Sequence, residues 1–233
     1  IEANSGAFVL TATDGSYVET TAPTSYDQVA SGSWEMFGVV YNTVDGDLEL
    51  SNYVNTYDIV SASYASISFN FNSSQGQAPG SIRFNNDGSK MFIVANIGQD
   101  INEYTLSTNF DVSTASFVDA FSVARQEDQP EGLAFNTDGT KMYVCGNTGD
   151  DINEYTLSTG FDISTSSYTR NFSVSSQETS PKGLSFNNDG TKMFVIGVSS
   201  DAINEYTLST AFNVSTASFV DAFSISSQAT NPM

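Results

Sequence analysis

DINEYTLST at 100–108 recurs unchanged at 151–159, and AINEYTLST follows at 202–210. Other residue types keep the same step of 51, among them Pro79, Pro130 and Pro181, and Met91, Met142 and Met193. The repeat covers 79–231 in three full copies, with no insertion or deletion between these anchors. A tandem period of this length is typical of stacked architectures, in which each unit hides its apolar faces against its neighbours.

Each copy contains four short segments rich in Thr, Ser, Val, Phe and Tyr, which favour strands. In the last copy these segments are 183–187, 192–198, 203–209 and 218–225. An Asn-Asp-Gly sequence between the first two is a signal for a tight hairpin. The second is apolar on both alternating faces, which predicts a strand covered on both sides. In the fourth, we expect Phe219, Phe223 and Ile225 to share one face.

A propeller blade consists of four strands in about fifty residues, and each repeat fits this description. The sequence therefore predicts an all-β fold, a β-propeller of tandem four-stranded antiparallel blades. Since 233/51 is about 4.6 repeats, the ring in this chain is expected to be incomplete. The glutamates beside the repeated tyrosines are expected to reach solvent or the backbone of a neighbouring blade.

The predicted boundaries follow the anchors. Residues 1–34 match no repeat and are interpreted as an attachment segment or as ring-completing strands. Residues 35–78 form a divergent blade, followed by blades at 79–129, 130–180 and 181–233, the last including the start of a further repeat. Because the chain begins at Ile1 and Pro232 would open a new copy, we expect a piece of a longer protein. A β-solenoid or fibre shaft with two coils per repeat is the less favoured alternative, since the halves of each repeat differ.

The hairpin segments resemble a known repeat family. FNNDGSKMFIV at 84–94, FNTDGTKMYVC at 135–145 and FNNDGTKMFVI at 186–196 are similar to the signature of YVTN and lactonase-like β-propeller repeats. EYTLSTGFDISTSSY at 154–168 resembles a longer repeat of marine phage and bacterial proteins of the tail-fibre or surface type. The resemblance implies the propeller fold, but propellers host enzymes, lectins and scaffolds alike.

The reactive side chains argue against ordinary catalysis. The chain has no histidine, which removes the usual general base and the commonest metal ligand. Cys145 is the single cysteine, and its place in the repeat predicts a buried apolar thiol. We therefore expect no enzymatic activity, no catalytic residues, no cofactor and no metal. A calcium ion in the acidic loops 148–153 or 44–49 stays open as an alternative. The repeated Asp-Gly pairs are interpreted as turns.

The charge excludes several partners. Seven basic against 27 acidic residues give a net charge of −20, which opposes binding to nucleic acid and to anionic membrane surfaces. No apolar run approaches the roughly 20 residues that a membrane helix needs. An acidic exterior suits a marine or extracellular setting, where salt screens self-repulsion.

The main hypothesis for function is a non-enzymatic virion structural protein, such as a tail fibre, that presents the propeller for host attachment. Its partners would be virion or surface-assembly proteins, copies of itself and a host receptor or glycan, at the virion or cell surface. A bacterial secreted propeller for adhesion or filament assembly is one alternative, and a lactonase-like enzyme with a central metal is another. Binding residues are expected in the loops where the copies diverge: Asn96, Gln99, Asp100, Asn147, Asp150, Asp151, Ser199, Ser200 and Asp201.

Overall fold

The computed structural model describes residues 64–71 and 78–227, together with the backbone of five short strands before them. The chain divides into two compact units, Ile1–Ser63 and Tyr64–Met233. The first unit has two antiparallel sheets, made of β1 (Ala3–Asn4), β2 (Ala7–Thr11) and β3 (Tyr17–Glu19), and of β4 (Phe37–Tyr41) and β5 (Leu48–Asn52). The predictions for the side chains of 1–63 and for the acidic loop 44–49 lie outside the described residues.

The described residues of the second unit form three antiparallel sheets of four strands each, which confirms the predicted fold of tandem four-stranded blades. The first blade contains β6 (Pro79–Phe84), β7 (Lys90–Ala95), β8 (Asp100–Leu106) and β9 (Ala115–Ser122). The second contains β10 (Pro130–Phe135), β11 (Lys141–Gly146), β12 (Asp151–Leu157) and β13 (Ser166–Ser173). The third contains β14 (Pro181–Phe186), β15 (Lys192–Gly197), β16 (Ala202–Leu208) and β17 (Ala217–Ser224).

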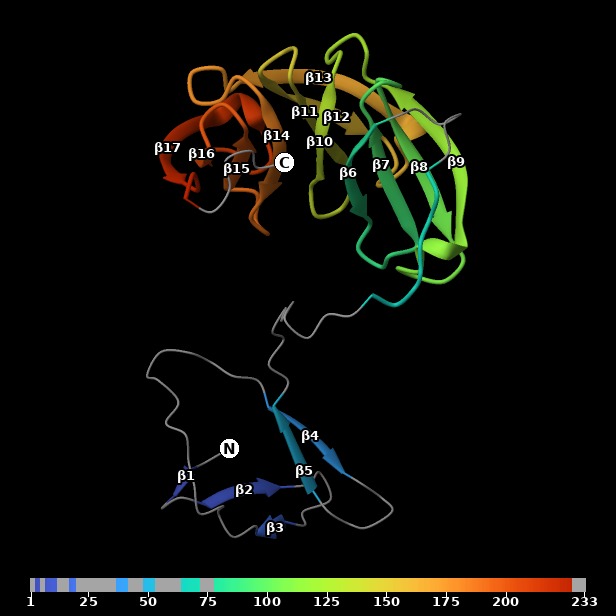
Figure 1. Ribbon diagram of the computed structural model, residues 1–233. Coiled ribbons are helices and arrows are strands. Elements are labelled where there is room, and N and C mark those ends of the chain that lie inside the picture. The colour runs from blue at the N-terminus through green and yellow to red at the C-terminus, as the bar shows by residue number, and fades with distance from the viewer. Residues whose placement is uncertain are drawn as a thin grey trace. The chain divides into compact units, whose positions relative to one another are not determined.

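The three sheets radiate from their first strands, as in an incomplete propeller (Figure 1). Strand β10 lies between β6 and β14 and contacts both. A single turn of 3-10 helix precedes the fourth strand of each blade: η3 (Val112–Thr114), η4 (Ile163–Thr165) and η5 (Val214–Thr216). This arrangement excludes the solenoid alternative for the repeats, because each copy closes its own sheet. Among the described residues, none of the helices has the length and apolar character to span a membrane.

The Asp-Gly pairs form the predicted turns between first and second strands. Asp138 Oδ1 accepts hydrogen bonds from the backbone N–H and the hydroxyl of Thr140. Gly139 has a φ of +72°, and a Cβ at this position would lie 2.2 Å from the ring of Phe161. Glycine is needed here both for the left-handed backbone and for the close aromatic contact.

A β-bulge changes the expected faces of the fourth strand. In the third blade, Tyr206 pairs with Phe219 while Glu205 pairs with Asp221, so one residue of β17 is unmatched. The extra residue reverses the alternation of side chains beyond it. The prediction that Phe219 and Phe223 share a face is therefore wrong. Phe219 packs on Tyr206 of its own blade, whereas Phe223 points to the opposite face of the sheet.

The bulge serves the packing between blades. Phe121 of the first blade contacts Tyr155 of the second, with ring centroids 5.5 Å apart. Phe172 of the second blade contacts Tyr206 of the third in the same way, at 5.6 Å. Since the second blade is covered on both sides, Met142, Tyr143, Val144 and Cys145 are all fully buried. The prediction of a strand covered on both faces holds for β11.

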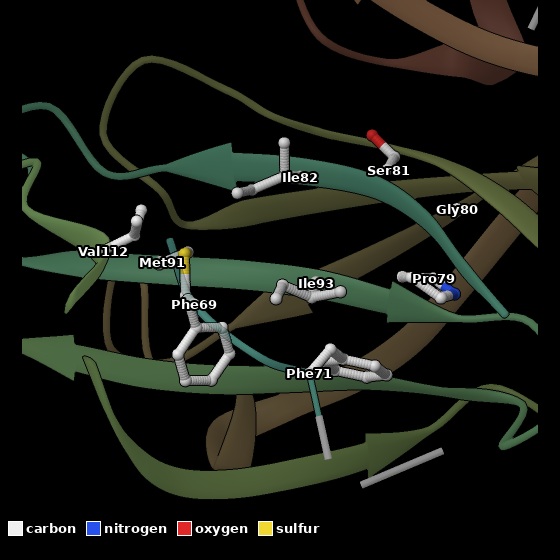
Figure 2. A pocket seen from close by; sticks show the side chains of 9 residues that line it. All are labelled: Phe69, Phe71, Pro79, Gly80, Ser81, Ile82, Met91, Ile93 and Val112. Carbon is white, nitrogen blue, oxygen red and sulfur yellow. The ribbon is translucent and has the colours of Figure 1, made fainter. Parts of the chain in front are cut away.

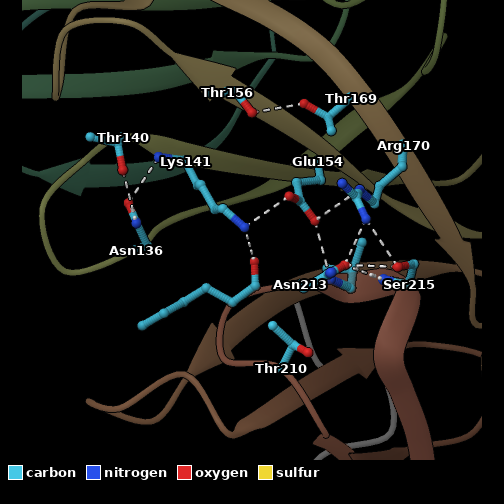
Figure 3. Close-up of polar contacts among 12 residues, drawn as sticks. Asn136, Thr140, Lys141, Glu154, Thr156, Thr169, Arg170, Thr210, Asn213 and Ser215 are labelled. Atoms are coloured by element: carbon cyan, nitrogen blue, oxygen red, sulfur yellow. Dashed lines mark hydrogen bonds and ion pairs between the residues drawn. The ribbon is translucent and has the colours of Figure 1, made fainter.

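Each blade also holds the next through a Lys–Glu clamp, defined by Lys90 with Glu103 and by Lys141 with Glu154. Lys141 Nζ lies 3.1 Å from Glu154 Oε1 and donates to the carbonyl of Phe212 at 2.6 Å. Glu154 Oε2 accepts the N–H of Val214 at 3.1 Å (Figure 3). The repeated glutamates thus reach the backbone of a neighbouring blade, as predicted. Glu103 and Glu154 are almost fully buried, so their charge is matched by lysine and by backbone donors.

Candidate functional site

The three innermost strands begin alike and then differ from blade to blade. After the shared proline, the second position is occupied by Gly80, Glu131 and Lys182 in turn. Lys182 Nζ lies 2.7 Å from Glu131 Oε1, which joins β14 to β10. Asn147, which directly follows β11, donates its Nδ2 to the same oxygen at 3.3 Å. Glu131, Lys182 and Asn147 form a polar cluster at the entry of the innermost strands, hereafter the entry cluster.

The entry cluster is ordered but accessible. The hydroxyl of Ser180 donates to Asn147 Oδ1 at 2.8 Å, which turns the amide nitrogen toward Glu131. The exposed fractions of the Lys182 and Glu131 side chains are 17% and 20%. Among the residues that the structure describes, none hydrogen-bonds the second oxygen of Glu131, Oε2. A solvent molecule or a ligand hydroxyl can therefore reach this oxygen.

Arg83 adds a second cation on the innermost strands. Its Nη2 donates to the carbonyl of Leu184 at 3.3 Å, so the side chain extends from β6 across to β14. The equivalent positions in the other blades are Ala134 and Ser185. Burial lowers the pKa of the Arg83 guanidinium, which keeps its charge near neutral pH because arginine starts from so high a value.

Two of the four basic residues that do not recur lie on innermost strands, and the other two, Arg125 and Arg170, lie elsewhere. Of its seven lysines and arginines, Lys90, Lys141 and Lys192 recur at the repeat step. Arg83 and Lys182 do not recur, and both lie on innermost strands. In the sequence, these residues can be recognised because they differ from the residues at the equivalent strand positions of the other copies. The predicted binding residues were instead chosen from loops in which the copies differ.

The predicted binding loops lie at the same end of the sheets as the entry cluster. Pro130, the first residue of β10, pairs with Gly146, the last residue of β11, so the loop at 147–150 is adjacent to the start of β10. A buried glutamate holds this loop. Glu127 accepts the N–H of Thr148 at 3.0 Å and that of Gly149 at 3.2 Å.

Glu178 repeats this arrangement 51 residues later. It accepts the N–H groups of Ser199 and Ser200, each at 3.0 Å, and the Ser200 hydroxyl at 2.7 Å. Burial alone would raise the pKa of Glu178, but the hydrogen bonds from Ser200, Ser180 and Ser199 outweigh it and hold the pKa below the usual value. Ser199 and Ser200 are thus hydrogen-bonded to Glu178, as Thr148 and Gly149 are to Glu127 one repeat earlier.

The remaining predicted residues make local contacts. Asn96 Nδ2 donates to the carbonyl of Pro130 at 3.2 Å, and Gln99 Nε2 donates to Asp128 at 2.9 Å. Asp150 and Asp201 both have a φ of +47°, and their carbonyls accept N–H groups from the segment after the fourth strand. Of the nine predicted residues, Asn147 alone contacts Glu131, and Asn96 lies against the neighbouring Pro130.

Two aspartates at the loop ends stabilise the sheets. Asp100 accepts a hydrogen bond from Asn102, and Asp151 accepts bonds from Asn153 and Asn171. Asp151 is only 7% exposed. Desolvation raises the pKa of both carboxyl groups, and the amide donors work in the opposite direction. These side chains face their own blade rather than the entry cluster.

Cys145 is fully buried, as predicted from its place in the repeat. Burial raises the pKa of its thiol to about 12, so the thiol is protonated near neutral pH. Within residues 64–71 and 78–227, no three His, Cys, Asp or Glu side chains come together as a metal-binding group. The described acidic loop at 148–153 instead directs Asp151 to its amide partners.

No protein-family model matches the sequence, and a search of curated proteins also found no match. Among solved structures, a putative 6-phosphogluconolactonase from Bacteroides fragilis is similar, with a TM-score of 0.51 at 11% identity. The match covers 94% of this chain and 64% of that one. The periplasmic gluconolactonase of Pseudomonas aeruginosa has a TM-score of 0.48 at 16% identity, covering 64% of this chain and 40% of that chain. The chain thus spans less than two thirds of the length of these proteins, and the likeness establishes a lactonase-like β-propeller fold.

These findings correct two expectations. A non-enzymatic virion attachment protein was expected, whereas the similar Bacteroides fragilis propeller is named as a putative 6-phosphogluconolactonase. The virion and tail-fibre part of the resemblance has no support among them. The expectation of no enzymatic activity rested on the missing histidine and the single cysteine, but carboxylate and lysine side chains can also act as bases and acids. The entry cluster has one group of each kind, 2.7 Å apart.

Proposed function

We propose that this propeller is part of a lactonase-like enzyme that hydrolyses a sugar lactone. The observation that carries the proposal is the entry cluster, a charged pair on the innermost strands where otherwise matching blades differ. The similarity to propellers named as gluconolactonase and 6-phosphogluconolactonase supports the choice of substrate class. The polar side chains of Asn147, Lys182 and Arg83 suit a ligand rich in hydroxyl groups.

The geometry of the entry cluster suits attack by water on an ester carbonyl. Glu131 Oε2 takes a proton from a water molecule while the oxygen of that water molecule bonds to the carbonyl carbon of the lactone. Lys182 and Asn147 donate N–H groups to the oxygen on which negative charge develops. The bond between this carbon and the ring oxygen then breaks, and the ring oxygen receives the proton held by Glu131. The product is the open-chain hydroxy acid, and one water molecule is consumed.

The test measures hydrolysis of glucono-δ-lactone by the full chain in a pH-stat, with spontaneous hydrolysis subtracted. We expect Glu131→Gln to lower kcat by about 100-fold or more, since a general base contributes 10²–10⁴-fold. Lys182→Met should lower kcat by about 100-fold, the loss typical of one oxyanion donor.

A matched control is available in the third blade. Lys192 and Glu205 form the same kind of pair at 2.6 Å, but on the second and third strands of their blade, β15 and β16. Glu205→Gln and Lys192→Met should leave the hydrolysis rate unchanged. Activity that persists in Glu131→Gln, or a full chain that never exceeds the spontaneous rate, would refute the proposal.

A further inference from the structure

Two cavities of the second unit differ in the chemistry of their linings. The larger, of about 360 Å³, lies on the first blade and is lined mainly by apolar side chains such as Ile82, Met91 and Ile93 (Figure 2). The smaller, of about 260 Å³, is lined by phenylalanine, asparagine and threonine residues from all three blades. Of the described residues that line the smaller cavity, none carries a charge. Because nothing in such a lining compensates the charge of an ion, the cavity suits a neutral ligand.

The smaller cavity lies at the end of the innermost strands opposite to the entry cluster. Phe84, Phe135 and Phe186, which line it, are the last residues of β6, β10 and β14. The Asp-Gly turns follow these residues, so the cavity is hereafter the turn-end pocket. Glu131 precedes Phe135 by four positions, as Lys182 precedes Phe186. At a rise of about 3.3 Å per residue, the pocket and the entry cluster are roughly 13 Å apart along the strands, and they are separate sites.

Pairs of phenylalanine rings form the walls of the turn-end pocket. The rings of Phe135 and Phe161 have centroids 5.3 Å apart, and those of Phe186 and Phe212 are 5.6 Å apart. All four side chains are half-buried, so packing leaves part of each ring accessible. The face of an aromatic ring is negative and attracts polarised C–H groups. A sugar ring carries such C–H groups, since every carbon of the ring bears an oxygen.

The polar side of the pocket is a row of hydrogen bonds that runs from blade to blade. Asn86 Nδ2 donates to the carbonyl of Thr137 at 2.8 Å. The hydroxyl of Thr137 donates in turn to the carbonyl of Asn188 at 3.2 Å. Asn86 and Thr137 are both exposed. These two side chains are therefore held in position while they remain within reach of a ligand from solvent.

The row leaves hydrogen-bonding groups of Asn86 available. Among the residues that the structure describes, none donates to Asn86 Oδ1, and only one N–H of its amide group is used. The hydroxyl oxygen of Thr137 also keeps its capacity to accept. An amide oxygen and an amide N–H side by side match two neighbouring hydroxyl groups, of which one donates and the other accepts.

We propose that the turn-end pocket binds a neutral sugar of the hexopyranose class. The sugar ring lies against Phe135 and Phe186, and its hydroxyl groups bond to Asn86 and Thr137. The volume of about 260 Å³ is below the roughly 300–1,000 Å³ of pockets for drug-sized ligands, so the pocket admits a single sugar ring. Binding here involves no chemical step and no residue of the entry cluster, and it goes beyond the proposed hydrolysis.

The test uses saturation-transfer difference NMR on the full chain with neutral probes, the methyl α-pyranosides of glucose, galactose and mannose. We expect saturation transfer to at least one of these glycosides. The transfer should be strongest at the C–H protons on one face of the sugar ring, because that face lies on phenylalanine. Gluconate, an anion of similar size, should show weaker transfer, since no cation lines the described pocket. Titration of the glycoside that binds gives its Kd.

Substitutions in the pocket should weaken this binding. Asn86→Ala and Thr137→Ala should each raise the Kd about fivefold, the effect of one hydrogen bond. Both side chains are exposed, so the fold should stay intact, as circular dichroism can verify. Phe186→Leu keeps an apolar side chain but removes the aromatic face, and should raise the Kd about tenfold. As a control, Thr169→Ala changes a threonine that is also exposed but lies on β13, and should leave the Kd unchanged.

An absence of transfer to all of the neutral glycosides would overturn the proposal. So would stronger transfer to gluconate, or a Kd that Asn86→Ala, Thr137→Ala and Phe186→Leu all leave unchanged. Glu131→Gln separates this site from the entry cluster, because it should retain sugar binding whatever its effect on lactone hydrolysis. Loss of sugar binding in Glu131→Gln would show that the sugar occupies the entry cluster, and would refute the turn-end pocket.

Discussion

The second and third blades have the same strands and share most of their sequence, but they differ in what surrounds them. Glu154 of the second blade is 1% exposed, whereas the side chain of Glu205 in the third is 29% exposed. Phe172 packs on a tyrosine of the next blade, while Phe223 is open to solvent. The burial of a residue in this fold is thus set by the neighbouring blade and not by its own strand. Matched substitutions in the two blades can separate these contributions.

The largest difference is expected at the clamp glutamates. Glu154→Gln removes a buried carboxylate that pairs with Lys141 and lies 3.8 Å from Arg170 Nε, and the free energy of unfolding should fall by about 3 kcal/mol. Glu205→Gln breaks an exposed pair and should lower it by less than about 1 kcal/mol. Urea denaturation of both variants at concentrations where the chain is monomeric measures the difference. Equal losses would show that the neighbouring blade contributes nothing to the pair.

A second comparison uses the apolar position of the innermost strand. Leu133 is fully buried between two blades, whereas Ile82 of the first blade is 47% exposed. Leu133→Ala should destabilise the protein by about 2–5 kcal/mol, the usual loss for a buried leucine. Ile82→Ala should change stability by less than about 0.5 kcal/mol, as at an exposed site. The measurement is the shift of the urea midpoint, and a large effect at Ile82 would mean that this face is already covered in solution.

A smaller effect is expected at the aromatic position of the second strand. The hydroxyl of Tyr143 donates to the carbonyl of Phe212 at 2.7 Å, and the first and third blades have phenylalanine there. Tyr143→Phe should lower stability by about 1 kcal/mol, the net value of one hydrogen bond. The reverse change, Phe194→Tyr, should be neutral in this chain, because the residues that the structure describes include no counterpart of the Phe212 carbonyl beyond the third blade. Thermal melts of both variants test this, and a gain in stability for Phe194→Tyr would count against the reasoning.

The smallest effect is a change in pH dependence. The second blade has Asp151 where the third has Ala202. Since burial raises the pKa of Asp151, the folded protein binds its proton more readily than the unfolded chain. That stabilisation is present below the ordinary aspartate pKa and is lost as the pH rises through the raised value. The stability of the wild type relative to Asp151→Asn should therefore decrease as the pH rises above the ordinary aspartate pKa.

Asp138 provides a control, because its pKa is shifted in the opposite direction to that of Asp151. Hydrogen bonds from Thr140 lower the pKa of Asp138, so its contribution is present above the ordinary aspartate pKa and is lost as the pH falls. The stability of the wild type relative to Asp138→Asn should increase as the pH rises toward the ordinary aspartate pKa and stay level above it. Parallel slopes for the two variants would contradict both assignments.

The fold could be predicted because the sequence contains three copies of the same 51-residue repeat. Periodic anchors place every strand of the repeats, and the Asp-Gly pairs place the turns. The bulge in the fourth strand could not be foreseen, because an extra residue in one strand leaves the 51-residue step unchanged. Phe223 was consequently assigned to the wrong face.

The candidate site was harder to predict than the fold. The search for variable residues led to the loops, where Asn147 contacts Glu131. Glu131 and Lys182 are single residues within strands, 51 positions apart, and only the packing of β10 beside β14 brings them to 2.7 Å. A sequence shows that such residues break the repeat, but their meeting depends on how neighbouring sheets are arranged.

Because Cys145 is fully buried, probes can be attached to cysteines introduced elsewhere in this protein without labelling the native thiol. Its thiol is the only one in the chain, and it is both inaccessible and protonated. A cysteine introduced on an outer strand would therefore be the sole site for a maleimide dye or a spin probe, with no need to remove the native residue first. Distances between single probes on different blades could then be measured in a background that does not react.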